Sequence, residues 1–369
     1  MKLLQKLKNY WTLGNPFRTR IAYVGWTGHQ NFGDEMLYQA YQRLFPEYHV
    51  LPFVKLSPGK KGLYKKITGR DVFAAGCLGG GTLINRSKGR LKTFSKLLDA
   101  CPVCFCLGTG VANAGFWEGR GDWGDELKRW VELLKRCQFV GVRGPVGAEM
   151  LRQAGLKDVK VVGDSALAFA RESCATPEEK TVGVNVGTAL GNVWGTEEEM
   201  VERIALACKA LRAKGWNILF WCVWPSDMDA TKALAKQIGV AEQKIHLITN
   251  DVEDALDLCG RCTTFIGMKL HSVVTAICAG VPSIMIEYRP KCRDFMASLG
   301  LEEFVVRSDS IDVDQLVSMS ESLAAERSAV QTKMRARISE CKERLTNGAG
   351  EIKRIIEDRA RETRRSGRR

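Results

Sequence analysis

Polar residues that can bind and activate an anion are concentrated between residues 265 and 295. Cationic side chains and an imidazole beside the expected amino terminus of a helix can hold a phosphate or carboxylate, because such termini favour negative charge. An imidazole can also accept or donate a proton near neutral pH. Each side chain alone is more simply a core histidine or a solvated lysine, but their clustering favours a functional site. The residues are Lys269, His271, Glu287, Arg289 and Lys291.

A strand-helix-strand unit is predicted to position these residues. Thr264–Gly267 is predicted to end a buried strand, Ser272–Ala279 has helical length, and Ser283–Ile286 is predicted to form a second strand. Gly280 and Pro282 are typical helix stops. In an open parallel sheet the ligand crevice lies at the carboxyl ends of the strands, which is where this pattern puts the five polar residues.

Glycine-rich turns and polar residues also follow strands predicted in the first half. Glycine lets a backbone approach a ligand closely, although turn chemistry alone explains the glycines about as well. The pattern lacks the Gly-Lys-Ser/Thr of a P-loop and the full dinucleotide fingerprint. The residues are Asn31, Gly33 and Asp34 after the first strand, Gly79, Gly80 and Gly81 after the third, Arg143 after the fifth and Asp164 after the sixth.

The chain of 369 residues is long enough for two domains. Apolar runs alternate with amphipathic segments, as in α/β proteins with a doubly wound parallel sheet. We expect a Rossmann-like domain at 21–170, a linker at 171–180, a second Rossmann-like domain at 181–310 facing a cleft between the two, and C-terminal helices at 311–346. Strands are expected at 21–26, 49–54, 72–77, 103–107, 139–142 and 159–162, then at 182–186, 217–223, 245–248, 264–266 and 283–286.

Both ends of the chain are basic. Residues 1–20 form an amphipathic segment that could lie on an anionic membrane surface or dock on the protein's own body. Residues 347–369 form a basic tail that we expect to be disordered. The formal net charge is +13, but no nucleic-acid-binding module is recognisable, so we expect no nucleic-acid partner.

The thirteen cysteines lack the spacing of a disulfide framework, which predicts reduced thiols in a cytoplasmic protein. The basic ends could also bring this protein to the inner face of the membrane. Cys259 and Cys262 have a C-x-x-C spacing without a second pair, which favours core packing over metal binding. We therefore expect neither a metal nor a redox cofactor.

Together these motifs resemble the polysaccharide pyruvyl transferase family. The resemblance implies a GT-B-like pair of Rossmann-type domains. It also implies transfer of pyruvate from phosphoenolpyruvate to a sugar, as a ketal, during synthesis of a cell-surface polysaccharide or its lipid-linked precursor. The motifs are Gly28-x-x-Asn31-x-Gly33-Asp34, Gly79–Gly81, Val142-Arg143, Gly163-Asp164, Leu270-His271, Gly280-Val281-Pro282 and Tyr288-x-x-Lys291.

The resemblance carries Arg143, His271 and Lys291 over as the important basic residues. Where the family usually has Arg before Leu-His, this chain has Lys269, which keeps the charge but loses the bidentate fork. Phosphoenolpyruvate carries a phosphate and a carboxylate, so it requires several fixed cations, while ketal formation requires proton transfers that suit an imidazole. Asp34, Asp164 and Glu287 are the candidates for activating a sugar hydroxyl.

Two other interpretations fit the sequence. A GT-B glycosyltransferase that uses a nucleotide-sugar would share the two domains and a basic carboxyl-terminal site. A non-catalytic module that binds anionic polymers through its basic ends is the second, and its binding would survive loss of His271 and collapse with salt.

Overall fold

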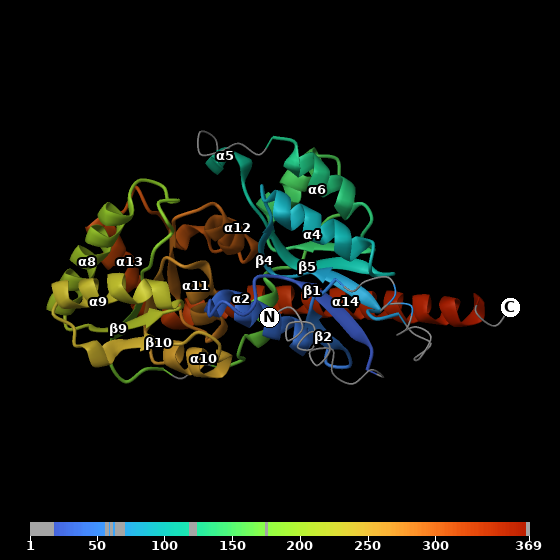
Figure 1. Cartoon of the computed structure of the whole chain (residues 1–369). Helices are drawn as coiled ribbons and strands as arrows, with labels where there is room; N and C mark the ends of the chain where they lie inside the picture. Colours follow the sequence, from blue (N-terminus) through green and yellow to red (C-terminus); the bar gives the residue numbers. More distant parts are fainter. Residues whose placement is uncertain are drawn as a thin grey trace. The chain divides into compact units, whose positions relative to one another are not determined.

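The computed structural model describes residues 18–55, 59, 62, 71–117, 124–173 and 176–366. The chain divides into two compact units (Figure 1). Unit 1 contains the chain up to Trp26, residues 38–165, and residues from Arg344 onward, whereas unit 2 contains Thr27–Leu37 and residues 166–343. Thr27–Leu37 belongs to unit 2, so the turn after the first strand packs with the second half of the chain.

Unit 1 is built on a seven-stranded parallel sheet in the order β2-β1-β3-β5-β6-β7, with β4 paired to β5. The helices α4, α6 and α7 share one apolar core with one face of the sheet. The strands are β1 (Arg20–Val24), β2 (His49–Pro52), β3 (Ala75–Leu78), β4 (Gly81–Ile84), β5 (Cys104–Val111), β6 (Phe139–Val142) and β7 (Lys160–Val161). The helices are α2 (Phe32–Leu44), which begins in unit 2, α4 (Lys88–Leu98), α5 (Ala114–Trp117), α6 (Glu126–Leu134) and α7 (Pro145–Gln153).

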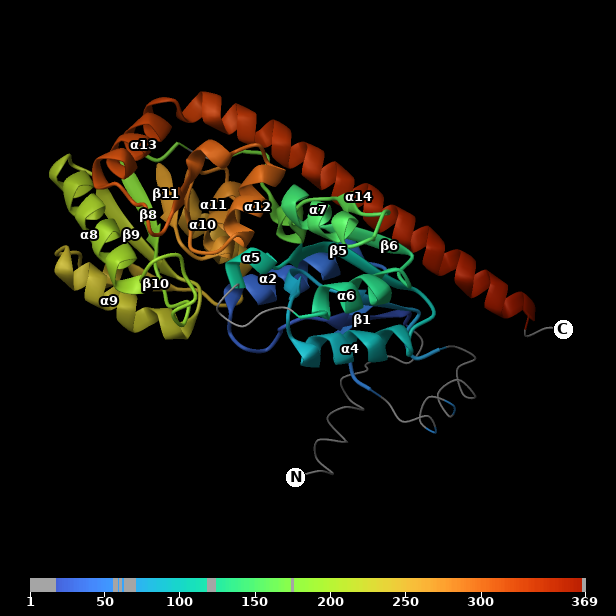
Figure 2. The same cartoon turned by 90° about the horizontal axis from the view of Figure 1, so that it is seen from above.

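Unit 2 is built on a six-stranded parallel sheet in the order β10-β9-β8-β11-β12-β13. Helices α8 and α13 pack together on one face, and α10 and α11 pack together on the other (Figure 2). The strands are β8 (Thr181–Asn185), β9 (Asn217–Cys222), β10 (Ile245–Leu247), β11 (Thr264–Gly267), β12 (Ser283–Glu287) and β13 (Val305–Arg307). The helices are α8 (Glu197–Ala213), α9 (Met228–Gln237), α10 (Val252–Gly260), α11 (Leu270–Cys278), α12 (Lys291–Ser298) and α13 (Val313–Ala325).

Two parallel sheets covered by helices confirm the expected α/β class with two Rossmann-like domains. Every strand that the sequence predicts is present within a few residues of its expected bounds. The strands β4 and β13 were not predicted, since each has only three or four residues and no flanking apolar run marks it. Cys259 and Cys262 are buried free thiols, as expected of core packing.

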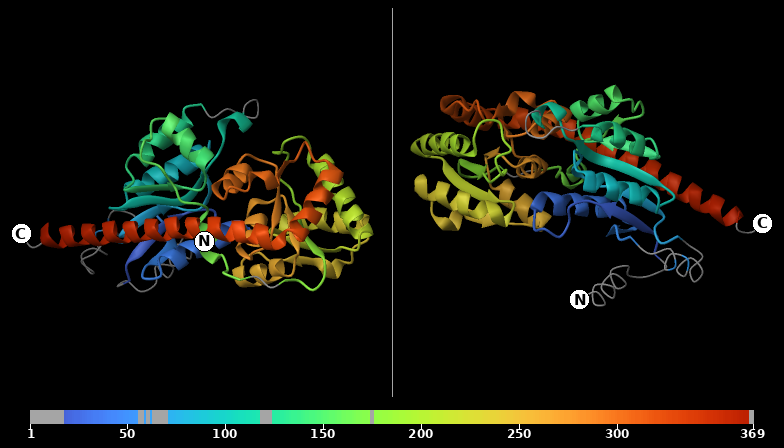
Figure 3. Two further views of the ribbon diagram at one scale, coloured as in Figure 1. Left: turned by 180° about the vertical axis from the view of Figure 1, so that it is seen from behind. Right: turned by 45° about the horizontal axis from the view of Figure 1, so that its top comes forward.

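The prediction of a disordered basic tail is wrong for residues 347–366. Helix α14 runs from Arg327 to Ser366, and its C-terminal half runs along unit 1 (Figure 3). Ile352 and Ile356 are buried against this unit, while Arg359 pairs with Glu362 at 3.0 Å. Charge composition alone suggested disorder, but opposite charges spaced three or four residues apart stabilise a helix.

The amphipathic segment predicted at residues 1–20 falls outside the described residues as far as residue 17. Of the rest, Arg20 begins β1 and is buried. No helix in the described parts of the chain is both long and apolar enough to cross a bilayer.

Candidate active site

The predicted site residues fall into two groups, one in each unit. The first group lies at the carboxyl edge of the unit 2 sheet, where β9, β8, β11 and β12 are neighbours. Adjacent parallel strands end at one edge, so loops that are far apart in the sequence meet there. This group contains Asn31, Gly33, Asp34, Lys269, His271, Glu287, Arg289 and Lys291, and the second, in unit 1, contains Gly79, Gly80, Gly81, Arg143 and Asp164.

His271 is the second residue of α11 and follows the buried strand β11. Its side chain is half-buried, and its backbone oxygen accepts a hydrogen bond of 2.6 Å from Thr275 Oγ1. Gly280 stops the helix with a φ of +80°, a conformation that glycine adopts without strain. The imidazole is therefore held at the amino-terminal end of a short, almost fully buried helix.

The imidazole of His271 packs against the backbone of Gly33. A Cβ atom built on Gly33 would lie 2.1 Å from His271 Nδ1, so only glycine leaves room for the ring. Asn31 caps α2, the helix that contains Gly33, because the Asn31 Oδ1 accepts hydrogen bonds from the N–H of Gly33 (3.1 Å) and of Asp34 (3.4 Å). The turn after the first strand and the Leu-His pair thus form one structure.

Two hydrogen bonds hold this turn on unit 2. The N–H of Phe32 donates to Val223 O at 2.9 Å, and Trp224 Nε1 donates to His29 O at 3.3 Å. Gln30 adopts a φ of +54°, a conformation that is uncommon for residues other than glycine and that clusters at functional sites. The turn is fixed beside the end of β9 and the start of α11.

We expect Gly33→Ala to lower activity sharply while leaving the fold intact. The added methyl group must displace the His271 ring, and a misplacement of about 1 Å can cost roughly 100-fold in rate. Turnover and melting temperature would be measured together, with Gly260→Ala as the control, because nothing lies within 4 Å of a Cβ at Gly260. An active Gly33→Ala enzyme would show that this contact does not position a reacting group.

Lys269 lies directly before α11 and is tied to two neighbouring loops. Its Nζ lies 3.3 Å from Asp227 Oδ1 and donates to Thr188 O. The ammonium also lies 5.7 Å from the centre of the Trp224 ring. The side chain is 14% exposed, so a small anion can still reach it.

Glu287 ends β12 and is paired with a residue that the sequence analysis did not consider. Its Oε2 accepts from Arg293 Nε at 2.9 Å and lies 2.8 Å from Arg293 Nη2. Burial raises the pKa of the Glu287 carboxyl, and the guanidinium of Arg293 opposes that rise. A carboxylate held by a guanidinium is a weaker candidate for the base than a free one.

Arg289 and Lys291 flank the buried ring of Tyr288, at 5.2 and 4.9 Å from its centre. Burial raises the pKa of the Tyr288 phenol to about 12, so the ring stays neutral beneath the two cations. Arg289 donates to Asn192 O and Ala189 O, each at 2.8 Å, which fixes the loop after β8. Lys291 is the first residue of α12, and its contact with a substrate anion stays a prediction.

Arg143 and Asp164 form a fully buried ion pair in unit 1. Arg143 Nη1 lies 3.4 Å from Asp164 Oδ2, and both side chains are 0% exposed. Arg143 Nη2 donates to Thr82 Oγ1 at 3.2 Å, and a Cβ on Gly110 would lie 2.3 Å from this nitrogen. The geometry gives this pair a structural role at the carboxyl edge of the sheet, and direct contact with a substrate would require the pair to open.

The Gly79–Gly81 turn joins β3 to β4 in unit 1. A Cβ on Gly79 would lie 2.2 Å from the Tyr23 ring, and Gly81 has a φ of +88°. Packing and turn geometry thus explain Gly79 and Gly81. A substrate contact through the Gly80 backbone stays a prediction.

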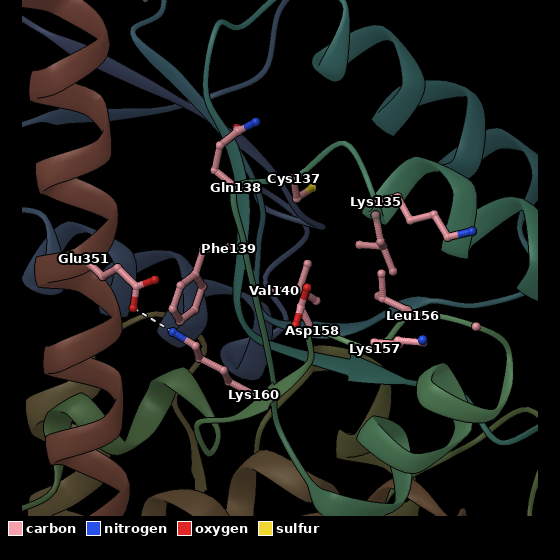
Figure 4. Close-up of a pocket in the computed structure, with 12 residues that line it drawn as sticks. Lys135, Cys137, Gln138, Phe139, Val140, Leu156, Lys157, Asp158, Lys160 and Glu351 are labelled. Atoms are coloured by element: carbon pink, nitrogen blue, oxygen red, sulfur yellow. Dashed lines mark hydrogen bonds and ion pairs between the residues drawn. The ribbon is translucent and has the colours of Figure 1, made fainter.

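A surface pocket of about 490 Å³ lies at the amino-terminal ends of strands β6 and β7 in the unit 1 sheet (Figure 4). Lys160 and Glu351 form one wall and pair at 2.7 Å, and Cys137 lines the same pocket. None of the predicted site residues lines this pocket.

Sequence reasoning missed Asp227, Trp224, Thr188 and Arg293. The first two follow β9 and Thr188 follows β8, so the strand-end rule that found His271 would also have pointed to them. For Arg293 the useful signal was its place six residues after the strand-end Glu287.

Comparison with solved structures defines the class of fold. The chain is similar to a glycosyltransferase from Rickettsia africae ESF-5, with a TM-score of 0.59 and 10% identity over 92% of this chain and 98% of that one. It is also similar to a proposed UDP-N-acetylglucosamine 2-epimerase from Listeria monocytogenes, with a TM-score of 0.54 and 11% identity over 86% and 90% of the two chains. The protein therefore has a GT-B fold.

Within that class the family is defined by sequence. The polysaccharide pyruvyl transferase family model matches residues 31–290, which is most of the chain, so the protein belongs to this family of transferases. The match begins at Asn31, in the turn that contacts His271, and ends at Pro290. No curated protein matches the chain.

Proposed function

We propose that the protein transfers pyruvate from phosphoenolpyruvate to two hydroxyl groups of a sugar, forming a ketal on a cell-surface polysaccharide or its lipid-linked precursor. The observation that carries the proposal is the contact between His271 and Gly33. This contact joins the Gly33 motif to the Leu270-His271 motif at the amino terminus of α11. Lys269 lies two residues before His271, and Gly33 and His271 both fall within the residues that the family model matches.

The reaction that we propose balances without a further reagent. A proton adds to the methylene carbon of phosphoenolpyruvate, two sugar hydroxyl oxygens bond to the adjacent carbon, and the bond from that carbon to the phosphate oxygen breaks. One hydroxyl proton replaces the proton taken up by the new methyl group, and the other leaves with inorganic phosphate. His271 is our candidate for delivering or removing these protons, and Lys269 and Lys291 are our candidates for binding the two anionic groups.

Among the carboxylates, Asp34 is our first candidate for activating a hydroxyl. It lies in the first turn of α2, directly after Gly33, whose backbone packs against the His271 imidazole. Asp34→Asn should then lower turnover more than Glu287→Gln does, in kinetics with a saturating donor.

The experiment that tests the function compares two donors. Purified protein is supplied with candidate lipid-linked and nucleotide-linked glycans and with either phosphoenolpyruvate or nucleotide-sugars. We expect release of inorganic phosphate from phosphoenolpyruvate that depends on the acceptor. Release of a nucleotide from a nucleotide-sugar, with phosphoenolpyruvate left intact, would favour the glycosyltransferase instead.

We further propose that the basic ends bring the enzyme to the inner face of an anionic membrane, where a lipid-linked acceptor would lie. Residues 357–363 of α14 are all exposed, whereas Ile352 and Ile356 are buried, so deletion after Ile356 removes the exposed end and spares the packed turns. Deleting residues 1–17 together with residues 357–369 should reduce binding to phosphatidylglycerol vesicles and leave activity on a soluble acceptor unchanged. Equal vesicle binding by both forms would refute the membrane contact.

A further inference from the structure

Asp227 is a buried carboxylate at the candidate site that neither the family resemblance nor the reaction above assigns. It follows β9, begins α9 as its cap residue, and is 0% exposed. A buried charge costs several kcal/mol unless it is paired and fully hydrogen-bonded. Asp227 therefore has to be explained by what it contacts.

The contacts of Asp227 are incomplete. Its Oδ1 accepts from the N–H of Thr188 at 3.1 Å and lies 3.3 Å from Lys269 Nζ. Its Oδ2 is also buried and has no hydrogen-bond partner among the residues that the structure describes. Burial raises the pKa of the carboxyl, and Lys269 opposes the rise. An incompletely satisfied buried carboxylate is a cost that proteins retain chiefly at functional sites.

The loop after β8 is shaped to let Asp227 and Lys269 meet. A Cβ on Gly187 would lie 2.3 Å from Asp227 Oδ1 and 2.7 Å from Lys269 Cε, so a side chain there would separate the pair. Asn185 Oδ1 accepts from the backbone N–H of Lys269 at 2.9 Å. Both ends of the lysine are thus fixed, through the neighbouring strands β9, β8 and β11.

Fixing Lys269 has a consequence for anion binding. A lysine side chain carries about 2 kcal/mol of rotamer entropy, which a ligand must otherwise overcome when it orders the ammonium. Lys269 lies two residues before His271 at the start of α11 and stays 14% exposed. An anion at this helix terminus would find the cation already in place.

We propose that Asp227 is a positioning residue: it fixes the ammonium of Lys269, the residue that caps α11, so that a phosphate or carboxylate can bind at the start of this helix. The proposal deepens the proposed function and rests on it for the identity of the anion. Charge alone predicts that Asp227 weakens anion binding, because its carboxylate repels an anion and partly cancels the lysine charge.

The test is a double-mutant cycle with Asp227→Asn, Lys269→Gln and the double variant. Asparagine keeps the shape of the side chain and can still accept from Thr188. We expect phosphoenolpyruvate to bind about tenfold more weakly to each single variant than to the wild-type protein, as measured by calorimetry without acceptor. The double variant should bind it as weakly as either single variant, and no more weakly. Independent effects would multiply to about 100-fold, and tighter binding by Asp227→Asn would also overturn the proposal.

Controls separate this result from a loss of folding and from a wrong donor. Asp257→Asn removes a carboxylate from an exposed pair with Arg171 in the same unit and should leave binding unchanged. Melting temperatures of all variants show whether a change in affinity results from a loss of folding. Lys269→Arg, with Asp227 intact, should bind the anion more tightly than Lys269→Gln does. The cycle is repeated with UDP-N-acetylglucosamine and inorganic phosphate.

Each outcome with these probes is decisive. If only the nucleotide-sugar or inorganic phosphate binds, and the cycle is non-additive, the positioning role stands and the pyruvyl donor is wrong. If phosphoenolpyruvate binds and the cycle is additive, the function stands and the positioning role is wrong. If none of the three anions binds the wild-type protein, both are wrong.

Discussion

His271→Ala is expected to lower turnover by roughly 100-fold or more with little change in melting temperature. Loss of a general acid or base commonly has this effect, which corresponds to about 2.7 kcal/mol of transition-state stabilisation. The imidazole is half-buried and packs on the Gly33 backbone, so its removal opens little space in the core. Steady-state kinetics and thermal unfolding of the same preparation would be compared.

The matched control for this variant is His246→Ala. His246 lies in the edge strand β10 of the same unit, and β9 and β8 separate this strand from β11, so turnover should stay near the wild-type value. His271→Gln keeps hydrogen-bonding capacity but cannot move protons near neutral pH, and it should be as impaired as His271→Ala. A destabilised but fully active His271→Ala protein would assign this histidine to the fold rather than to catalysis.

Arg143→Met is expected to destabilise unit 1 by about 3 to 5 kcal/mol, because it leaves the Asp164 carboxylate buried without its guanidinium. At roughly 2 to 4 °C per kcal/mol for a domain of this size, the melting temperature should fall by about 10 °C. The double variant Arg143→Met with Asp164→Leu should recover much of the loss, since no buried charge remains.

The opposite result would return Arg143 to the substrate site. If Arg143→Met melted like the wild-type protein but bound phosphoenolpyruvate much more weakly, its guanidinium would have to leave Asp164 and contact the donor. The measurement therefore separates the role that the family resemblance implies for Arg143 from the role that its burial indicates.

The sequence predicted the sheets well because buried parallel strands are continuous apolar runs with glycine or proline at their ends. The runs before Gly79, Arg143 and His271 are examples, and all three are strands. Helix α14 was predicted only in part, because its exposed end is charged on every face and its stability depends on paired charges and on Ile352 and Ile356 packing against unit 1.

The strand-end rule also found His271 and the lysines near it, since it needs only the order of strands and turns. It could not find the contact of Asp227 with Lys269, because the strand order of unit 2 brings those two loops together. It also could not find the contact of Gly33 with His271, because the turn that contains Gly33 follows a strand of the unit 1 sheet but packs in unit 2. Contacts between side chains follow from topology, which residue types and spacing do not specify.

The most direct measurement follows the carbon skeleton of the donor. Phosphoenolpyruvate labelled with ¹³C at the carbon that bears the phosphate would be incubated with the protein and with lipid-linked glycans, and the products observed by NMR. We expect the label to appear as a quaternary ketal carbon bonded to two sugar oxygens, with one inorganic phosphate released for each ketal. Both signals should grow roughly 100-fold more slowly with His271→Ala. Label that stays in phosphoenolpyruvate while a nucleotide-sugar is consumed would contradict pyruvyl transfer.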